Sequence, residues 1–103
     1  MISIVITHHA YQRGKERLSL SRKPLEKIAN KAFENGVRHC DTKGQLNKYL
    51  SKIYLQHGNA NNIRCYGEYV FLFVDNRLIT LYQLPVELRN HVKISKKNKE
   101  SNE

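Results

Sequence analysis

The feature that most constrains the fold is a run of strand-forming residues near the C-terminus, IRCYGEYVFLFVDNRLITLYQL at 63–84. Branched and aromatic side chains dominate this run, and two turn-forming pairs, Gly67-Glu68 and Asp75-Asn76, interrupt it. Branched and aromatic residues favour strands, and two-residue turns join antiparallel neighbours. The run therefore predicts three antiparallel strands that form a meander.

Two-residue turns would also decide which side chains share a face of this sheet. Tyr66 would lie opposite Tyr69, and Val74 opposite Arg77. Side chains alternate across a strand, so this register predicts one aliphatic and one aromatic face. The aliphatic face would carry Ile63, Cys65, Val70, Leu72, Ile79 and Leu81. The aromatic face would carry Arg64, Tyr66, Tyr69, Phe71, Phe73, Thr80 and Tyr82.

The remaining sequence predicts one strand and three helices before the meander. ISIVIT at 2–7 is rich in strand-forming residues. Helical spacing and capping residues predict helices at 8–19, at 22–35 and at 43–57, and residues 86–94 form a short helix or an ordered extension. The expected fold is a single small α+β domain. Its mainly antiparallel sheet consists of the N-terminal strand and the C-terminal three-stranded meander, with two to three helices.

The charge of the chain indicates what kind of partner it has. The 103 residues carry a formal net charge of +9 at pH 7 and suffice for one domain, which we expect at 1–92. Residues 93–103 hold four lysines and two glutamates and are expected to be a disordered basic tail, so +7 remains on the folded body. A basic folded body favours nucleic acid as partner, with an acidic protein or an anionic membrane surface as alternatives.

Composition also indicates the compartment. No stretch approaches the roughly 20 apolar residues that a membrane span needs. The N-terminal MISIVIT has no basic segment before it and no small-residue cleavage site after it. Two cysteines, Cys40 and Cys65, are few for a secreted scaffold. These observations predict a cytoplasmic chain that does not contact membranes.

The segment ITHHAYQRGKERL at 6–18 is the first candidate for chemistry. In a helix that begins near His8, the side chains of His9, Arg13 and Arg17 would stand one turn apart on one stripe. A neutral imidazole can act as a general base, and arginines can hold a phosphate or stabilise a charged transition state. The alternative is a solvated helix with a histidine at its start and two arginines in line by chance.

The aromatic face of the meander is the second candidate. Aromatic rings beside basic groups suit single-stranded RNA, because its unstacked bases can lie on such rings. The alternative is that helices cover this face and the rings are core. Arg64 discriminates between the two, since a buried arginine without partners would be costly.

A metal site or a nucleotide cofactor is not predicted. The potential ligands show no zinc-finger or metalloprotease spacing. They are His8, His9, His39, Cys40, His57 and Cys65. Cys40 lacks any signature of a nucleophile, and Cys65 is expected in the core. No glycine-rich phosphate loop or dinucleotide fingerprint is present, so we expect no cofactor.

The order of strand, basic helix, second helix and meander resembles that of the RelE-like ribonuclease toxins, a superfamily that shares its fold class with barnase-like and EndoU-like nucleases. Uncharacterised small domains of this kind carry the pattern Thr-x-His-Ala-x-x-Arg-x-x-x-Arg, which reads here as Thr7, His9, Ala10, Arg13 and Arg17. The resemblance covers most of residues 2–84 in element order, although the helix at 43–57 is longer than the pattern leads one to expect. It implies helices on one face of the sheet and RNA on the other.

The resemblance also implies a reaction and residue roles. The reaction is metal-independent RNA cleavage, in which a 2′-hydroxyl attacks the adjacent phosphate. His9 would be the base or acid, and Arg13 and Arg17 would hold the phosphate. The sheet would contribute Arg64, Tyr82 and Tyr69. The expected RNA-binding residues are His8, Lys15, Tyr66, Tyr69, Phe71 and Thr80.

The sequence thus predicts an RNA-acting protein, a metal-independent endoribonuclease of RelE-like toxin type. Its expected partners are RNA, free or on the ribosome, and an antitoxin or other acidic protein. Two alternatives remain. One is a nucleic-acid-binding module without catalysis. The other is a basic interaction protein, of phage or mobile-element type, that blocks an acidic partner. Binding of RNA that weakens with salt would separate these two.

Overall fold

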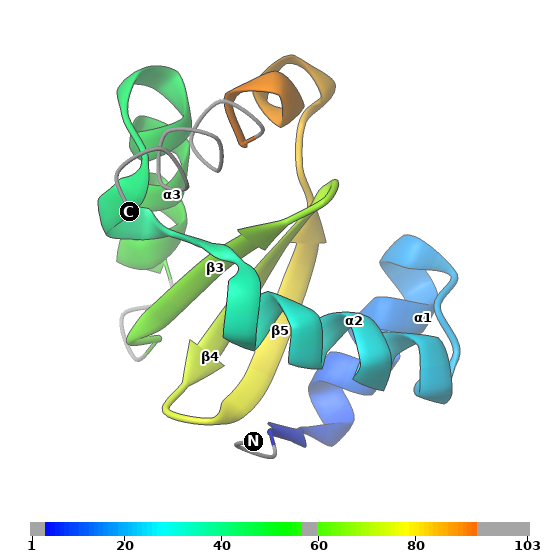
Figure 1. The fold of residues 1–103 in the computed structure, drawn as a ribbon. Helices are drawn as coiled ribbons and strands as arrows, with labels where there is room; N and C mark the ends of the chain where they lie inside the picture. The colour runs from blue at the N-terminus through cyan, green and yellow to red at the C-terminus, as the bar shows by residue number, and fades with distance from the viewer. Residues whose placement is uncertain (1–3, 57–59, 93–103) are drawn as a thin grey trace.

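The expected meander forms the centre of the sheet. The computed structural model describes residues 4–56 and 60–92 (Figure 1). Its sheet has five strands in the order β1-β5-β4-β3-β2. The strands are β1 (Val5–Ile6), β2 (Val37–Arg38), β3 (Asn62–Tyr66), β4 (Tyr69–Val74) and β5 (Arg77–Gln83). The expected tail at 93–103 lies outside the described residues.

The helices lie close to their expected positions. They are α1 (His8–Leu18), α2 (Arg22–Asn35) and α3 (Gly44–Gln56), and residues 86–92 form a fourth helix. A short 3-10 turn, η1 (His39–Asp41), joins β2 to α3. In the described part of the chain, no helix is long and apolar enough to cross a membrane. The described part of the chain is therefore a single α+β domain with four α-helices, where two to three were expected.

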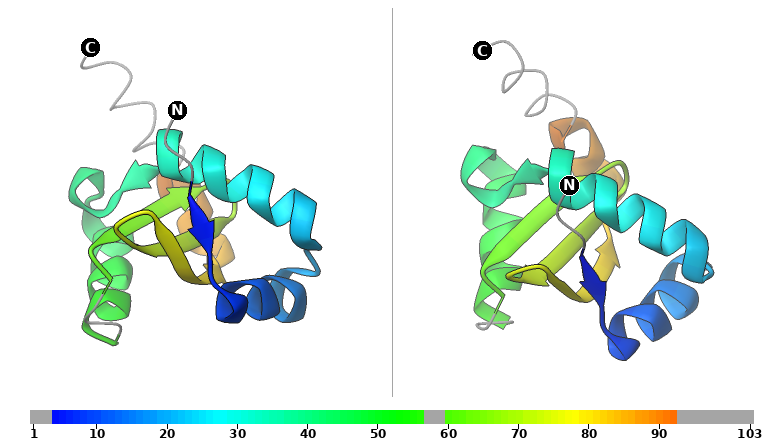
Figure 2. Two further views of the ribbon diagram at one scale, coloured as in Figure 1. Left: turned by 90° about the horizontal axis from the view of Figure 1, so that it is seen from below. Right: turned by 60° about the horizontal axis from the view of Figure 1, so that its bottom comes forward.

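The sheet is mixed and mostly antiparallel. The three meander strands and β2 pair antiparallel, whereas β1 runs parallel to β5. Figure 2 shows β1 beside the hairpin of β4 and β5 and continuing into α1. The strand β2, at the opposite edge of the sheet, was not expected from the sequence. It pairs two residues only, Val37 with Cys65 and Arg38 with Arg64.

The register is confirmed in one hairpin and wrong in part of the other. Tyr66 lies opposite Tyr69 and Val74 opposite Arg77, as expected. A bulge between Leu72 and Phe73 then shifts the pairing of β4 with β5 by one residue. Because directly opposed residues share a face, a one-residue shift transfers side chains to the other face.

The bulge corrects the face assignment of three residues. Thr80 lies opposite Leu72, and Tyr82 lies opposite Val70, so both leave the aromatic face. Leu81 lies opposite Phe71 and joins the buried cluster on the aromatic side. Thr80 and Tyr82 therefore face away from Arg64 and Tyr69, contrary to expectation.

Helices cover both faces of the sheet. On the aromatic face, α1 and α2 bury Phe71 and Phe73 against Ala10, Leu25 and Ala29. On the other face, α3 and the helix at 86–92 form a second buried cluster with the sheet (Figure 1). Its members are Val37, Leu46, Leu50, Ile53, Ala60, Ile63, Cys65, Val70, Leu72, Leu84, Leu88 and Val92. The expectation that the aromatic face would be open to RNA is therefore wrong for the covered rings.

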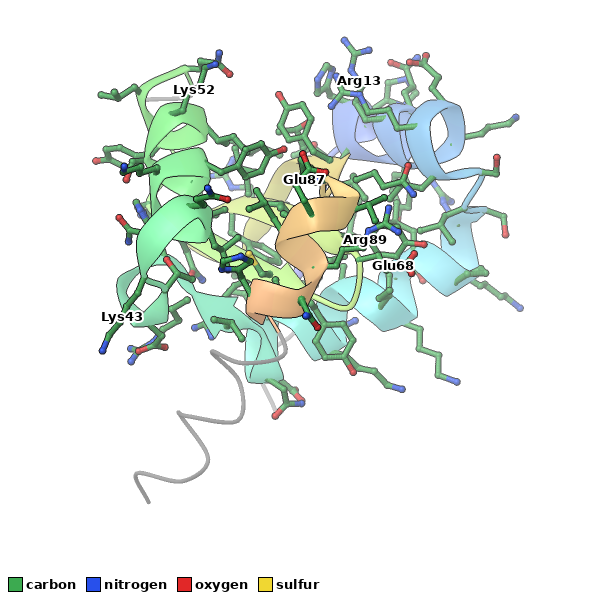
Figure 3. The ribbon with its side chains drawn as sticks, turned by 90° about the horizontal axis from the view of Figure 1, so that it is seen from above. Arg13, Lys43, Lys52, Glu68, Glu87 and Arg89 are labelled. Atoms are coloured by element: carbon green, nitrogen blue, oxygen red, sulfur yellow. The ribbon has the colours of Figure 1, made fainter. Side chains whose placement is uncertain are left out.

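Specific contacts fix the helix at 86–92 and the crossing of α1 with α2. Arg89 donates from Nε to the carbonyl of Leu84 at 3.1 Å, and its Nη1 lies 3.7 Å from Oε1 of Glu68 in the turn between β3 and β4 (Figure 3). At the crossing of α1 and α2, a Cβ on Gly14 would approach Leu25 to 2.9 Å. Gly14 therefore allows the two helices to pack closely, which compensates for its low helix propensity.

Candidate functional site

Helix α1 follows β1 directly and lies alongside β5. The backbone N–H and the hydroxyl of Thr7 both donate to the carbonyl oxygen of Leu78, at 3.1 and 2.9 Å. The same hydroxyl accepts the backbone N–H of Ala10 at 3.2 Å and so caps α1. Two turns later, Nη1 of Arg17 donates to the carbonyl of Leu81 at 3.0 Å. These bonds hold α1 alongside β5, with its polar stripe next to the strand.

His9 and Arg13 form the exposed end of this stripe. Arg13 donates from Nε to Nε2 of His9 at 3.3 Å, and its Nη1 lies 3.2 Å from Oε2 of Glu16. Nε2 is the acceptor in this contact, because a guanidinium can only donate. His9 is exposed, and the side chain of Arg13 retains 37% of its accessible surface. Both groups can therefore reach a ligand in solvent.

Arg17 connects the stripe to the sheet. Its guanidinium carbon lies 4.4 Å from the ring centroid of Tyr82, within the range of a cation–π contact. The bulge in the hairpin of β4 and β5 puts Tyr82 on the face of the sheet that α3 covers, on β5 beyond the two residues that pair with β1. His9, Arg13, Arg17 and Tyr82 thus form one continuous surface, which we call the α1–β5 edge. Four of the five expected catalytic residues lie on it.

Arg64, the fifth, lies elsewhere. It stands on β3 and donates from Nη1 to the carbonyl of Gly36 at 3.0 Å and from Nε to Oδ1 of Asn62 at 2.9 Å. Gly36 ends α2, and a Cβ at that position would lie 3.0 Å from the Cβ of Arg64. The partners of Arg64 indicate that it stabilises the connection from α2 to β2. Its expected role in catalysis is not supported by this position.

We expect Arg64→Met to lower the free energy of unfolding by about 1–3 kcal/mol, because it leaves the Gly36 carbonyl without this donor in a half-buried site. Chemical denaturation measures this effect. Arg77→Met, at an exposed position where β5 begins, is the matched control and should change stability by less than about 0.5 kcal/mol. RNA affinity should be the same in both variants. A loss of RNA affinity in Arg64→Met alone would mean that Arg64 belongs to the RNA-binding site.

The expected RNA-binding residues are scattered. His8 and Lys15 are exposed on α1, but Lys15 lines a hollow at the turn to α2, away from the stripe. Tyr66 and Tyr69 are half-buried beside the core under α1 and α2. Phe71 is 0% and Thr80 4% exposed. The expectation that these last two contact RNA is therefore wrong for this conformation, because neither side chain reaches solvent.

A second polar hollow was missed by sequence reasoning. It has a volume of about 380 Å³ and lies at the far edge of the sheet, where β2 ends. Its lining residues are Arg38, His39, Asn47, Asn61, Asn62 and Ile63. Many of their polar atoms hold the local structure together. Arg38 pairs with Asp41, and Asn47 donates to the carbonyl and hydroxyl oxygens of Thr42. These bonds indicate that the hollow supports the entry to α3.

The described residues form neither a metal-binding cluster nor a reactive thiol site. No three His, Cys, Asp or Glu side chains of residues 4–56 and 60–92 lie close enough to hold a metal ion. His57 lies outside these ranges. Cys65 is buried in the core, as expected, and this burial raises the pKa of its thiol to about 12. A thiol with so high a pKa is unreactive at neutral pH.

Comparison of the chain with protein-family models, with curated proteins and with solved structures finds no match. The likeness to RelE-like toxins therefore remains an interpretation of a short motif and of the order of elements. The charges of the α1–β5 edge and the chemistry of its side chains are the features of the molecule that indicate a function.

Proposed function

We propose that this chain binds and cleaves RNA at the α1–β5 edge, as a metal-independent endoribonuclease of RelE-like type. The observation that carries the proposal is the continuous surface formed by His9, Arg13, Arg17 and Tyr82. It combines a potential base, two permanent cations and an aromatic ring. The formal charge of +9 supports a polyanionic partner.

The chemistry requires a base and a stabilised phosphate. In the proposed reaction, the 2′-oxygen forms a bond to the adjacent phosphorus, and Nε2 of His9 takes the hydroxyl proton. The bond from phosphorus to the 5′-oxygen breaks, and that oxygen takes a proton from water. Arg13 and Arg17 stabilise the negative charge on the phosphate oxygens. The products are a 2′,3′-cyclic phosphate and a 5′-hydroxyl end.

The bond between Arg13 and His9 gives this reaction an order of events. In the observed geometry, Arg13 occupies the lone pair on Nε2 of His9, the atom that would accept the proton. A phosphate competes for the guanidinium, because a charged acceptor forms a stronger hydrogen bond than a neutral imidazole. Binding of the substrate would therefore draw Arg13 away and free His9 to act as the base.

The proposal extends to the setting of the protein. A toxin of this type acts in the cytoplasm on free or ribosome-bound RNA, and an antitoxin or other acidic protein restrains it. The exposed cations of the α1–β5 edge offer such a protein a complementary surface, since acidic partners are steered to basic ones. A partner that covers His9 and Arg13 would block RNA as well.

The test is cleavage of a labelled single-stranded RNA by the purified chain in the presence of EDTA. We expect products that end in a 2′,3′-cyclic phosphate. An RNA with a 2′-deoxy nucleotide at the cleaved position should remain intact, because the attacking hydroxyl is missing. Cleavage of this control would contradict the mechanism. Absence of both RNA binding and cleavage would contradict the proposed function as a whole.

A second candidate function is RNA binding without cleavage. The position of Arg64, bonded to the carbonyl of Gly36, favours it, because this removes one of the expected catalytic groups from the edge. This candidate predicts that wild-type protein binds RNA in a salt-dependent manner and leaves it intact, with or without ribosomes.

A further inference from the structure

The surface next to the α1–β5 edge belongs to α3. On this helix, Tyr49 and Lys52 stand three residues apart and are neighbours on one side of the helix. Tyr49 is half-buried and packs against the same core cluster as Tyr82. Helix α3 carries Lys48 and Lys52 and no acidic residue, so its solvent side is cationic.

Tyr82 lies between the two helices. Arg17 of α1 lies over its ring at 4.4 Å. The pKa of Tyr49 is raised mainly by burial, and Cys65 and Tyr82 add to the effect through their charged forms. Both tyrosine rings pack against the buried cluster under α3, and Arg17 of α1 contacts one of them.

Figure 3 shows where one cation of each helix lies. Arg13 on α1 and Lys52 on α3 project toward the same side of the molecule from the two helices. Glu87, on the helix at 86–92, points toward this side from between them. Among the described residues, Glu87 takes part in no ion pair, so its charge acts on whatever binds there.

We propose that single-stranded RNA crosses this surface from Arg13 on α1, over Tyr82 and Tyr49, to Lys52 on α3. This inference rests on the proposed function and names residues that the α1–β5 edge did not include. Aromatic rings between cations suit a single strand, because its bases can stack on the rings while its phosphates contact the cations. A duplex hides the faces of its bases and would use the cations alone.

Glu87 should limit the affinity of this surface. Its carboxylate repels phosphate, and removal of the charge should strengthen RNA binding. Lys52 should act in the opposite sense. Two charges whose removal changes affinity in opposite directions are not explained by altered folding, because destabilisation can only weaken binding.

The test measures binding of a fluorescent single-stranded RNA by anisotropy at several salt concentrations. We expect Lys52→Ala to weaken binding roughly 3- to 10-fold and to reduce the slope of log K against log salt by about 0.7, the value for one phosphate contact to a single strand. Glu87→Gln should strengthen binding by roughly 2- to 5-fold. The matched controls Lys31→Ala and Glu34→Gln lie on α2 and should change it by less than about twofold.

The aromatic part of the path is tested by Tyr49→Leu. It should weaken binding of the single strand by roughly 5- to 100-fold, as expected for the loss of one stacked base, and leave binding of a duplex of the same length unchanged. Circular dichroism checks that the variant is folded.

The outcomes separate this inference from the proposed function. Suppose that wild-type protein binds RNA and Arg13→Ala weakens it, but Lys52→Ala and Glu87→Gln do not change it. The path over α3 is then wrong, and the α1–β5 edge remains. Duplex bound as tightly as the single strand would also overturn the path. If the wild type binds no RNA, both proposals fail, and the cations serve an acidic protein.

Discussion

His9→Ala should lower the rate of RNA cleavage by roughly 10²- to 10⁴-fold, the contribution expected of a positioned general base. The imidazole is exposed and its Nε2 accepts a hydrogen bond from Arg13, so it is the group of the α1–β5 edge that can accept a proton. The measurement is the single-turnover rate with saturating protein and EDTA. Because Arg13 and Arg17 remain, RNA affinity should change by less than about threefold.

His8→Ala is the matched control for this experiment. His8 is also exposed and immediately precedes His9, but it does not bond to Arg13. Because the protein is saturating, a contribution of His8 to RNA binding does not enter the single-turnover rate, and its replacement should change the cleavage rate by less than about twofold. If both variants cleave as fast as the wild type, His9 is not the base. If His9→Ala loses binding and cleavage in parallel, His9 contacts the RNA and does not take the proton.

The parts of the fold that were predicted depend on capping residues, turn residues and apolar spacing that lie within the elements themselves. Helix α2 begins after Ser21 and ends before Gly36, as expected, because the capping residues and the apolar spacing lie within the helix itself. The turn between β3 and β4 was also predicted. Gly67 has a φ of 62°, a conformation that glycine adopts without steric cost, and this fixes the register of that hairpin.

The bulge between β4 and β5 could not be predicted from local signals. Leu78 accepts two hydrogen bonds from Thr7, 71 residues earlier in the chain, and the strand β1 pairs beside it. These long-range bonds hold the start of β5, while Leu81 must enter the core opposite Phe71. A bulge satisfies both constraints. No turn-forming residue marks its position in the sequence. For this reason Thr80 and Tyr82 were assigned to the wrong face.

The candidate site was predictable to the extent that it lies on one helix. His9, Arg13 and Arg17 stand at helical spacing, so their stripe follows from the sequence. Arg64 donates to a backbone carbonyl, and because any residue can provide one, no residue type in the sequence indicates this partner. Tyr49 stands at helical spacing from the buried residues Leu46 and Ile53, so the sequence alone indicates a core position, and what else it approaches depends on how α3 packs.

Phe71→Ala should lower the free energy of unfolding by about 3–5 kcal/mol, a large part of the roughly 5–15 kcal/mol typical of a small domain. The ring is fully buried under α1 and α2. It lies edge-on to Tyr69 with centroids 6.3 Å apart and stacks with Phe73 at 6.5 Å. Its removal leaves a cavity in the core and ends both contacts. Chemical denaturation with a two-state fit measures the change.

Comparison of Phe71→Leu with Tyr82→Leu then distinguishes a ring that only packs in the core from a ring that contacts RNA. Leucine fills most of the buried space, so Phe71→Leu should remain folded and bind RNA as the wild type does, within about twofold. Tyr82→Leu removes a ring of the α1–β5 edge and should weaken RNA binding by roughly 5- to 100-fold. An equal loss in a folded Phe71→Leu protein would mean that RNA reaches the aromatic layer. The helices α1 and α2 would then have to leave the sheet, at the cost of the core that Phe71→Ala measures.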